Sequence, residues 1–202
     1  MSGWTLHNGQ AVSLPTDNID TDQLIPARFM SRPRNEGYGD LLLYDVRRSA
    51  SGEPDATFAL NRFPKASVIV AGRNFGSGSS REAAVYALVD AGIRVVIATS
   101  FGDIFTANAI NNGLLPARVE AADHERLQSH IRHSQVNACV DLTSHTISVD
   151  VIEVSFQLEE ALHVKLVNGW DDIDLTRKHA AKIATFRKKH LRDRPWSFPG
   201  TN

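Results

Sequence analysis

Short apolar runs separated by helix-forming stretches dominate the middle of the chain. Three runs have strand length, and they occupy residues 67–72, 93–98 and 114–119. The two stretches between them, residues 82–91 and 100–112, are each followed by a glycine, which commonly ends a helix. Strands and helices that alternate at this spacing predict right-handed units with parallel strands.

The pattern changes beyond residue 120. A polar amphipathic helix is predicted at residues 121–133, and hydrophobic and polar positions then alternate with period two, as in antiparallel strands. Three segments follow this alternation: residues 136–142, 146–151 and 154–158. Helices are predicted at residues 159–167 and, as an amphipathic C-terminal helix, at residues 174–191.

Two segments near the start have weaker patterns. Residues 4–14 predict a weak strand, broken near Asn8-Gly9 by a possible hairpin turn. Residues 31–58 contain glycine and proline amid charged residues, which predicts a long loop with at most one short helix around residues 40–44. Loops of this length inside a compact domain are usually functional or disordered, so we expect a mobile loop here.

Composition narrows the functional class. The chain has 202 residues, 42% of them hydrophobic, which suffices for one large domain or two small ones with a proper core. The net charge of −1 gives no electrostatic reason to expect nucleic acid or an anionic membrane as a partner. Basic residues cluster in 178–194, and we interpret them as a solvated helix face, with a binding patch as the alternative.

Cysteine usage and the chain start bear on compartment and cofactor. No apolar run has membrane-spanning length and the first residues lack a signal-peptide pattern, so we expect a cytoplasmic protein that does not enter a membrane. The single cysteine, Cys139, cannot form an intramolecular disulfide, which fits a reducing compartment. An iron–sulfur cluster normally needs three or four thiolates, so another polypeptide would have to hold one. None of the eight histidines recurs at metal-ligand spacing, and we expect no metal in this chain.

The most informative stretch is residues 74–82, Asn-Phe-Gly-Ser-Gly-Ser-Ser-Arg-Glu, between a predicted strand and a predicted helix. Backbone N–H groups in such a turn point at one place, which suits an anion. The spacing does not match a P-loop, a nucleophile elbow, or a dinucleotide fingerprint, which would need a third glycine at Arg81. There remain two interpretations: a serine pair and an arginine in an anion-binding turn, or a tight turn with capping serines and a surface arginine.

These residues carry a family resemblance. Residues 74–82 resemble the Gly-x-Gly-Ser-Ser-Arg-Glu signature of the mobile, swivelling domain of the aconitase superfamily. Residues 20–29, Asp-Thr-Asp-Gln-Leu-Ile-Pro-Ala-Arg-Phe, resemble that family's Asp-Thr-Asp-x-Ile-Ile-Pro opening. Residues 100–105 and 111–116 also resemble family segments, in the same order. Within the superfamily, the chain is most similar to the small subunits of bacterial 3-isopropylmalate dehydratase, the isomerase of leucine biosynthesis.

The resemblance implies a fold and a partner. The implied fold is an α/β swivelling domain over residues 1–202, with three layers (β/β/α), a parallel central sheet and a second antiparallel sheet. It implies a hydro-lyase that is active only as a heterodimer with a large subunit, which would carry a [4Fe-4S] cluster. The implied reaction interconverts 2-isopropylmalate and 3-isopropylmalate through 2-isopropylmaleate, so the substrate is a small dicarboxylate.

The resemblance also assigns roles to residues. Ser79 would be the catalytic base, and Ser80 and Arg81 would bind a substrate carboxylate. Asp20 and Asp22 would face the catalytic partner, although turn formation and helix capping are equally compatible with them. The segment after the Ile-Pro run would select the substrate, and its candidates are Phe29, Met30, Ser31 and Arg32. Glu82 at the helix start is interpreted as complementing the helix dipole.

Two positions depart from the family pattern. Position 77 is serine where many relatives have cysteine, and position 83 is alanine where a histidine usually follows the Arg-Glu pair. The second difference removes a polar group beside the predicted site, and therefore leaves the substrate open. A citraconate/methylmalate or dimethylmaleate hydratase would use the same base. A non-catalytic module that binds an anion in the same turn is the alternative from a different functional class.

Overall fold

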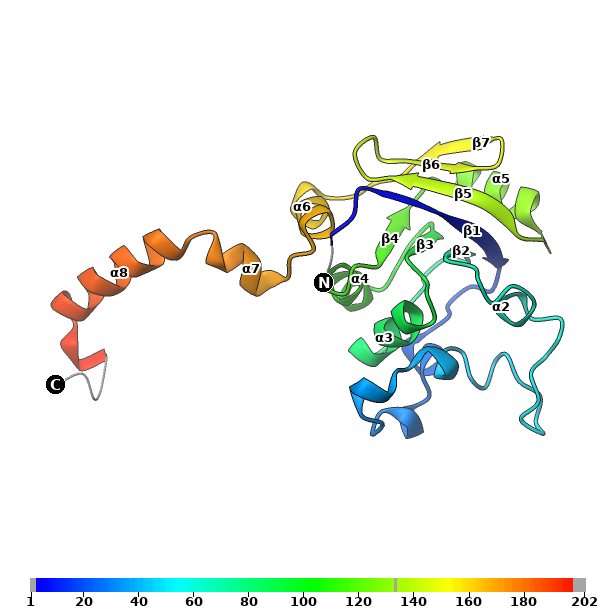
Figure 1. Cartoon of the computed structure of the whole chain (residues 1–202), viewed down its shortest axis with the longest axis horizontal. Helices are drawn as coiled ribbons and strands as arrows, with labels where there is room; N and C mark the ends of the chain where they lie inside the picture. The colour runs from blue at the N-terminus through cyan, green and yellow to red at the C-terminus, as the bar shows by residue number, and fades with distance from the viewer. Residues whose placement is uncertain (1–2, 133, 198–202) are drawn as a thin grey trace.

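A mixed sheet of seven strands forms the centre of the computed structural model, which describes residues 3–132 and 134–197 (Figure 1). The strand order across the sheet is β4-β3-β2-β1-β5-β6-β7. The strands are β1 Leu6–Leu14, β2 Val68–Ala71, β3 Val95–Ala98, β4 Leu115–Arg118, β5 Val136–Asp141, β6 Thr146–Val149 and β7 Ile152–Ser155. Strands β1 to β4 are parallel to one another, and β5 to β7 continue the sheet as antiparallel strands. The predicted α/β class is therefore confirmed.

The helices follow the predicted alternation with the strands. They are α1 Thr21–Leu24, α2 Ala59–Arg62, α3 Glu82–Asp90, α4 Asp103–Asn111, α5 Ala121–Ile131, α6 Glu160–Asn168, α7 Asp172–Arg177 and α8 Ala180–Asp193. Short 3-10 turns lie at η1 Ala27–Phe29, η2 Arg34–Glu36, η3 Gly39–Leu41 and η4 Pro195–Ser197. The predicted C-terminal helix over residues 174–191 is divided into α7 and α8. Residue 133, the predicted end of the helix that begins at residue 121, lies outside the described residues.

Strand β1 confirms the predicted strand in this part of the chain, but its pairing differs from what was expected. It pairs in parallel with β2 through residues 11–14 and antiparallel with β5 through residues 6–11. The antiparallel strands therefore join the parallel ones in a single sheet, and do not form the second sheet that was predicted. The expected hairpin at Asn8-Gly9 is absent from this continuous strand. A Cβ atom on Gly9 would lie 1.9 Å from the Ser67 hydroxyl, so the glycine serves close packing instead of a turn.

Alternating side chains of the central strands build a core on each face of the sheet. In β2, Ile69 and Ala71 pack into the core that includes α3, whereas Val68 and Val70 pack into the core that includes α5. The antiparallel strands bury alternate residues in this second core only, for example Val140 and Ile147. The central parallel strands are thus covered on both sides, as continuous apolar runs require.

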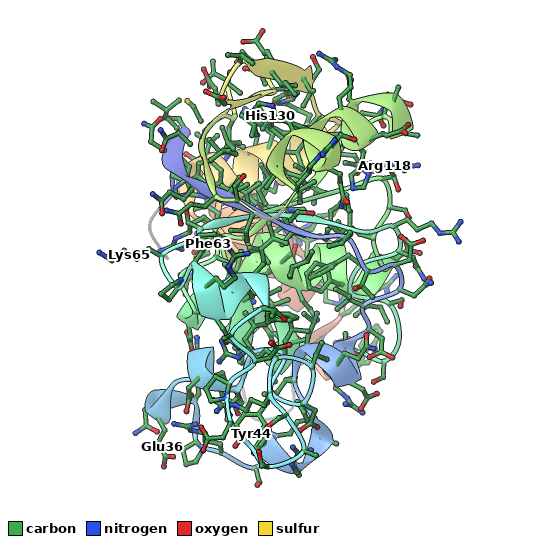
Figure 2. All side chains as sticks on the ribbon, turned by 90° about the vertical axis from the view of Figure 1, so that its right-hand side faces the viewer. Glu36, Tyr44, Phe63, Lys65, Arg118 and His130 are labelled. Carbon is green, nitrogen blue, oxygen red and sulfur yellow. The ribbon has the colours of Figure 1, made fainter. Side chains whose placement is uncertain are left out.

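The predicted loop over residues 31–58 is partly packed. Tyr38 and the three leucines at 41–43 are buried in the core that includes α3, and η3 coincides in part with the short helix expected around residues 40–44. Figure 2 shows Glu36 and Tyr44 at the end of the molecule opposite His130, so this segment forms one end of the protein. The expected mobility of the segment stays a prediction.

Candidate functional site

Three connecting segments meet where the parallel strands β1, β2 and β3 end. The N–H of Gly76, in the turn after β2, donates to the carbonyl of Ile19 at 2.7 Å, and the N–H of Thr21 donates to the carbonyl of Ser77 at 2.9 Å. The N–H of Phe75 donates to the carbonyl of Ser100, after β3, at 3.1 Å. The carboxyl ends of parallel strands are where α/β folds place their sites, so the turn lies where a site is expected.

The glycines of this turn are required by its geometry. Gly76 has φ of +71°, and a Cβ atom there would lie 2.2 Å from the ring of Phe105. Gly78 has φ of +102°, which L side chains rarely adopt. The ring of Phe105 also packs edge-on against Phe75 with 5.4 Å between ring centroids. The turn is therefore held rigidly against the start of α4.

Ser79 and Ser80 are exposed at the tip of the turn. Within the described chain, no hydrogen bond uses either hydroxyl, and the backbone N–H groups of residues 78–83 donate to no described acceptor. Helix α3 begins at Glu82 with Arg81 as its N-cap residue and without a side-chain cap. The serines therefore do not cap the helix, and unpaired N–H groups at the positive end of the helix dipole lie beside two free hydroxyls.

Arg81 is oriented by a contact that spans 59 positions in sequence. Its side chain is only 18% exposed and forms an ion pair with Asp22. The hydroxyl of Thr21, the residue before Asp22, donates to the carbonyl of Ser79 at 3.1 Å. Asp20 caps α1, where its carboxylate accepts from the N–H of Gln23 at 2.7 Å. Asp20 and Asp22 thus hold the local structure beside the turn, and their contact with a partner stays a prediction.

Comparison with known proteins supplies the family. The model of the aconitase C-terminal domain matches residues 1–122. The 3-isopropylmalate dehydratase small subunit of Shewanella baltica (strain OS185) is 45% identical over 192 residues, which cover 92% of this chain and 96% of that protein. The small subunit of Shouchella clausii (strain KSM-K16) is 42% identical over 187 residues, which cover 91% of this chain and 94% of that protein. This chain belongs to the family of 3-isopropylmalate dehydratase small subunits.

A solved structure agrees with this assignment to the dehydratase small-subunit family. The crystal structure of 3-isopropylmalate dehydratase from Methanocaldococcus jannaschii is 28% identical, with a TM-score of 0.66. The similarity covers 91% of this chain and 99% of that one. The resemblance inferred from the signature turn is confirmed, together with the role in a dehydratase that the family name carries.

The predicted specificity segment lies apart from the turn in its contacts. Phe29 packs edge-on against Tyr44 with 5.0 Å between ring centroids, and Arg32 pairs with Asp40 at 3.2 Å. Met30 and Ser31 are exposed. The hydrogen bonds, ion pairs and ring contacts of these four candidates stay within their own segment, and none that the described chain contains reaches residues 79–81. Substrate selection by them stays a prediction.

Sequence reasoning missed two residues that support the turn. One is Thr21, described above, which lies inside the Asp-Thr-Asp segment that carried part of the resemblance. The other is Asn112, whose amide donates to the Glu82 carboxylate at 2.9 Å. Burial, followed by the nearby Glu82 carboxylate, raises the pKa of Tyr86 one turn along α3. Glu82 does lie in the first turn of α3, where its charge complements the dipole, but it also links α3 to the end of α4.

The described residues contain no group of three His, Cys, Asp or Glu side chains placed to hold a metal ion. Cys139 lies in β5, opposite Asn8 and Ser148, in the antiparallel part of the sheet. One thiol at that place does not fit the ligand set of an iron–sulfur cluster. Across the same described residues, none of the helices combines the length and apolar character needed to span a membrane.

Proposed function

We propose that this chain is the small subunit of a 3-isopropylmalate dehydratase that isomerises 2-isopropylmalate and 3-isopropylmalate in leucine biosynthesis. The family membership supports the reaction. The observation that carries the site is the pair of hydroxyls of Ser79 and Ser80, which bond to no described residue and lie beside N–H groups at the start of α3 that likewise lack a described acceptor. Such a place stabilises negative charge on an oxygen atom, which an anionic substrate and a serine base both require.

Ser79 is the base in this proposal. A serine hydroxyl is weakly acidic, so its alkoxide forms only where fixed positive electrostatics stabilise it. The N–H groups of residues 78–83, the dipole of α3 and Arg81 supply that environment. The Ser79 alkoxide takes a proton from the substrate carbon next to a carboxylate, and the hydroxyl on the neighbouring carbon departs as hydroxide. Return of the proton from Ser79 to that hydroxide gives 2-isopropylmaleate and one water, and restores the alkoxide. Addition of water in the opposite sense gives the other isomer.

Ser80 and Arg81 bind a substrate carboxylate. The ion pair with Asp22 uses one terminal nitrogen of the guanidinium, and Nε and the other terminal nitrogen of Arg81 donate to no described residue. A guanidinium can donate to a carboxylate through two parallel hydrogen bonds, so Arg81 can hold Asp22 and a substrate at once. The Ser80 hydroxyl, also unbonded, is available for a further hydrogen bond.

A large subunit completes the site. Ser79 and Ser80 lie on an exposed turn, whereas enzymes enclose small substrates in concave sites. A cavity of about 440 Å³ does exist in this chain, but its lining includes none of residues 79–81. An iron–sulfur cluster held by that subunit would supply Lewis-acid assistance to the departing hydroxyl. Dependence on the second polypeptide follows, because the single cysteine cannot ligate a cluster and the cavity of the described chain does not include the serines.

Anaerobic reconstitution tests the proposal. The chain mixed with its cognate large subunit is expected to hydrate 2-isopropylmaleate, and Ser79→Ala should lower kcat by about two to four orders of magnitude while the two subunits still associate. Ser77→Ala is the matched control, because it removes a hydroxyl from the same turn and should keep activity within a few fold.

Two outcomes would contradict this proposal. Unchanged turnover in the Ser79→Ala complex would rule out Ser79 as the base. Binding of a dicarboxylate by the chain alone, with no hydration in any subunit pairing, would identify a non-catalytic anion-binding module instead.

A further inference from the structure

The C-terminal arm, defined as α7 together with α8, extends away from the rest of the protein (Figure 1). No residue of α7 or α8 is buried. Isolated helices of this length are marginally stable in water, and most helical stability in proteins comes from packing an apolar face. The arm therefore has the form of an element whose packing partner is another surface.

One face of the arm is apolar and hollowed. Ile173 of α7 and Ile183 and Leu191 of α8 line a groove of about 590 Å³ together with small and basic side chains. The fractional exposures of Ile173 and Ile183 are 61% and 46%, although large aliphatic side chains are usually buried. Burial of these side chains against a partner would be favourable, because transfer of apolar surface out of water is the main driving force of association.

The base of the arm is fixed to the protein body. The carboxylate of Asp171 accepts from the N–H of Asp174 at 2.8 Å and caps α7. Lys165 of α6 is buried and pairs with Asp172, and its ammonium group lowers the pKa of that carboxyl. The ammonium of Lys178 lies 4.0 Å from the centre of the Trp170 ring. The direction in which the arm leaves the body is thus set by specific contacts.

The base of the arm is also connected to the candidate site. Asn111 at the end of α4 accepts a hydrogen bond from Lys165 at 3.1 Å. The next residue, Asn112, donates to Glu82 at 2.9 Å. Glu82 is the first residue of α3 and directly follows the serine turn, residues 74–81. A polypeptide that covers Ser79 would therefore lie on the part of the molecule from which the arm extends.

Charge indicates the chemistry of the partner surface. Residues 178–194 contain seven Lys and Arg residues and one Asp, although the whole chain has a net charge of −1. Two arms packed against each other would bring like charges together, since Arg187 and Lys188 line the apolar groove itself. An apolar groove bordered by carboxylates complements the arm in both respects.

We infer that the arm is a docking element for the large subunit of the dehydratase. The large subunit binds the face of Ile173, Ile183 and Leu191 with an apolar surface of its own that is bordered by carboxylates. The inference rests on the proposed function, because it takes its partner from there. The arm then anchors the two subunits beside the site while Ser79 takes part in the chemistry, so binding and catalysis use separate parts of the chain.

The test measures the affinity of the full chain for its cognate large subunit. The double variant Ile183→Gln/Leu191→Gln should raise Kd by about tenfold or more, and should leave kcat unchanged at saturating large subunit. The matched control is Ala181→Gln/Thr185→Gln, which places the same side chains at exposed positions of α8 that do not line the groove and should keep Kd within about twofold. Higher salt should weaken the wild-type complex, because the arm is basic.

Each result decides a separate question. Unchanged Kd in the groove variant, or an equal loss of affinity in the control, would overturn the arm as the docking element. The proposed function would still stand in that case if the reconstituted wild-type enzyme is active. Sedimentation of the chain alone as a dimer that the groove variant dissociates, with unchanged affinity for the large subunit, would make a second copy the partner. Failure of the wild-type chain to bind the large subunit would overturn both proposals.

Discussion

The side chain of Arg81 is mostly buried, and a carboxylate from a distant part of the sequence determines its position. Asp22 is held by α1, whose hydrogen bonds to the serine turn fix the distance between the two segments. An arginine that binds substrate loses less conformational freedom on binding when another group has already ordered it. In the proposed site, Asp22 would therefore act on substrate binding through Arg81, as a positioning residue.

Asp22→Asn should separate this role from a structural one. The ion pair is exposed on the Asp22 side, so its loss should change the free energy of unfolding by at most about 1 kcal/mol. KM for the dicarboxylate should rise severalfold in the reconstituted enzyme, with a smaller effect on kcat. Asp17→Asn is the control, because Asp17 forms a similar ion pair with Arg73 at 2.9 Å at the same end of the sheet. Equal KM values for wild type and Asp22→Asn would show that Arg81 needs no orienting partner.

At the scale of elements, the serine turn depends on its packing against α4. Gly76→Ala would combine a strained backbone with a clash against Phe105, which is itself buried. We expect a loss of about 2 kcal/mol or more in the free energy of unfolding, measured in urea. Gly52→Ala is the matched control: φ is +84° there, but nothing lies within 4 Å of the added methyl group, so only backbone strain of about 1 kcal/mol remains. Equal losses in the two variants would contradict the packing argument.

The contact between β1 and the segment before β2 makes the stability of the folded protein depend on pH. His7 bonds to the Ser67 hydroxyl at 2.8 Å, and burial, followed by the charge of Arg94, lowers the pKa of His7 from its usual 6.5. The unfolded chain therefore takes up this proton at a higher pH than the folded chain does. Protonation of His7 therefore leaves the free energy of unfolding unchanged well above pH 6.5 and lowers it as the pH falls below 6.5.

His7→Gln should reduce that loss. Gln can still bond to Ser67 but does not titrate, so the urea midpoint of the variant should fall less than that of wild type between pH 7.5 and pH 5.5. Carboxylates that protonate in this range affect both proteins alike, so the difference between the two slopes isolates His7. Parallel slopes would show that the imidazole remains neutral or charged to the same extent in both states.

At the scale of the whole molecule, local signals determined what the sequence could predict. Strands β2 to β4, helices α3 and α4, and the serine turn between β2 and α3 were predicted because each is specified by neighbouring residues, such as the apolar run before Gly72 and the glycine after α3. The exposed serines were identified for the same reason. The two-sided pairing of β1 could not be predicted, because its partners lie far along the chain and the Asn-Gly pair has the local appearance of a turn.

Long-range side-chain pairs escaped prediction for a related reason. Neither the Arg81–Asp22 pair nor the Asn112–Glu82 hydrogen bond has a local signature, since each depends on how separate elements approach each other. The C-terminal helix was predicted from its amphipathic pattern, but that pattern continues through the break at residues 178–179. The break falls at Lys178, the C-cap residue of α7, and His179, the N-cap residue of α8, where Lys178 also contacts the ring of Trp170.

The position of β1 in the sheet has a consequence during translation. It is the first of the seven strands to be synthesised and the fourth in the spatial order, so both of its edges are unpaired when it leaves the ribosome. One edge is satisfied when β2 emerges, but the other stays open until β5 has been made. The nascent chain therefore carries an unpaired strand edge through most of its synthesis, which is a template for aggregation and a reason to expect protection by chaperones at that stage.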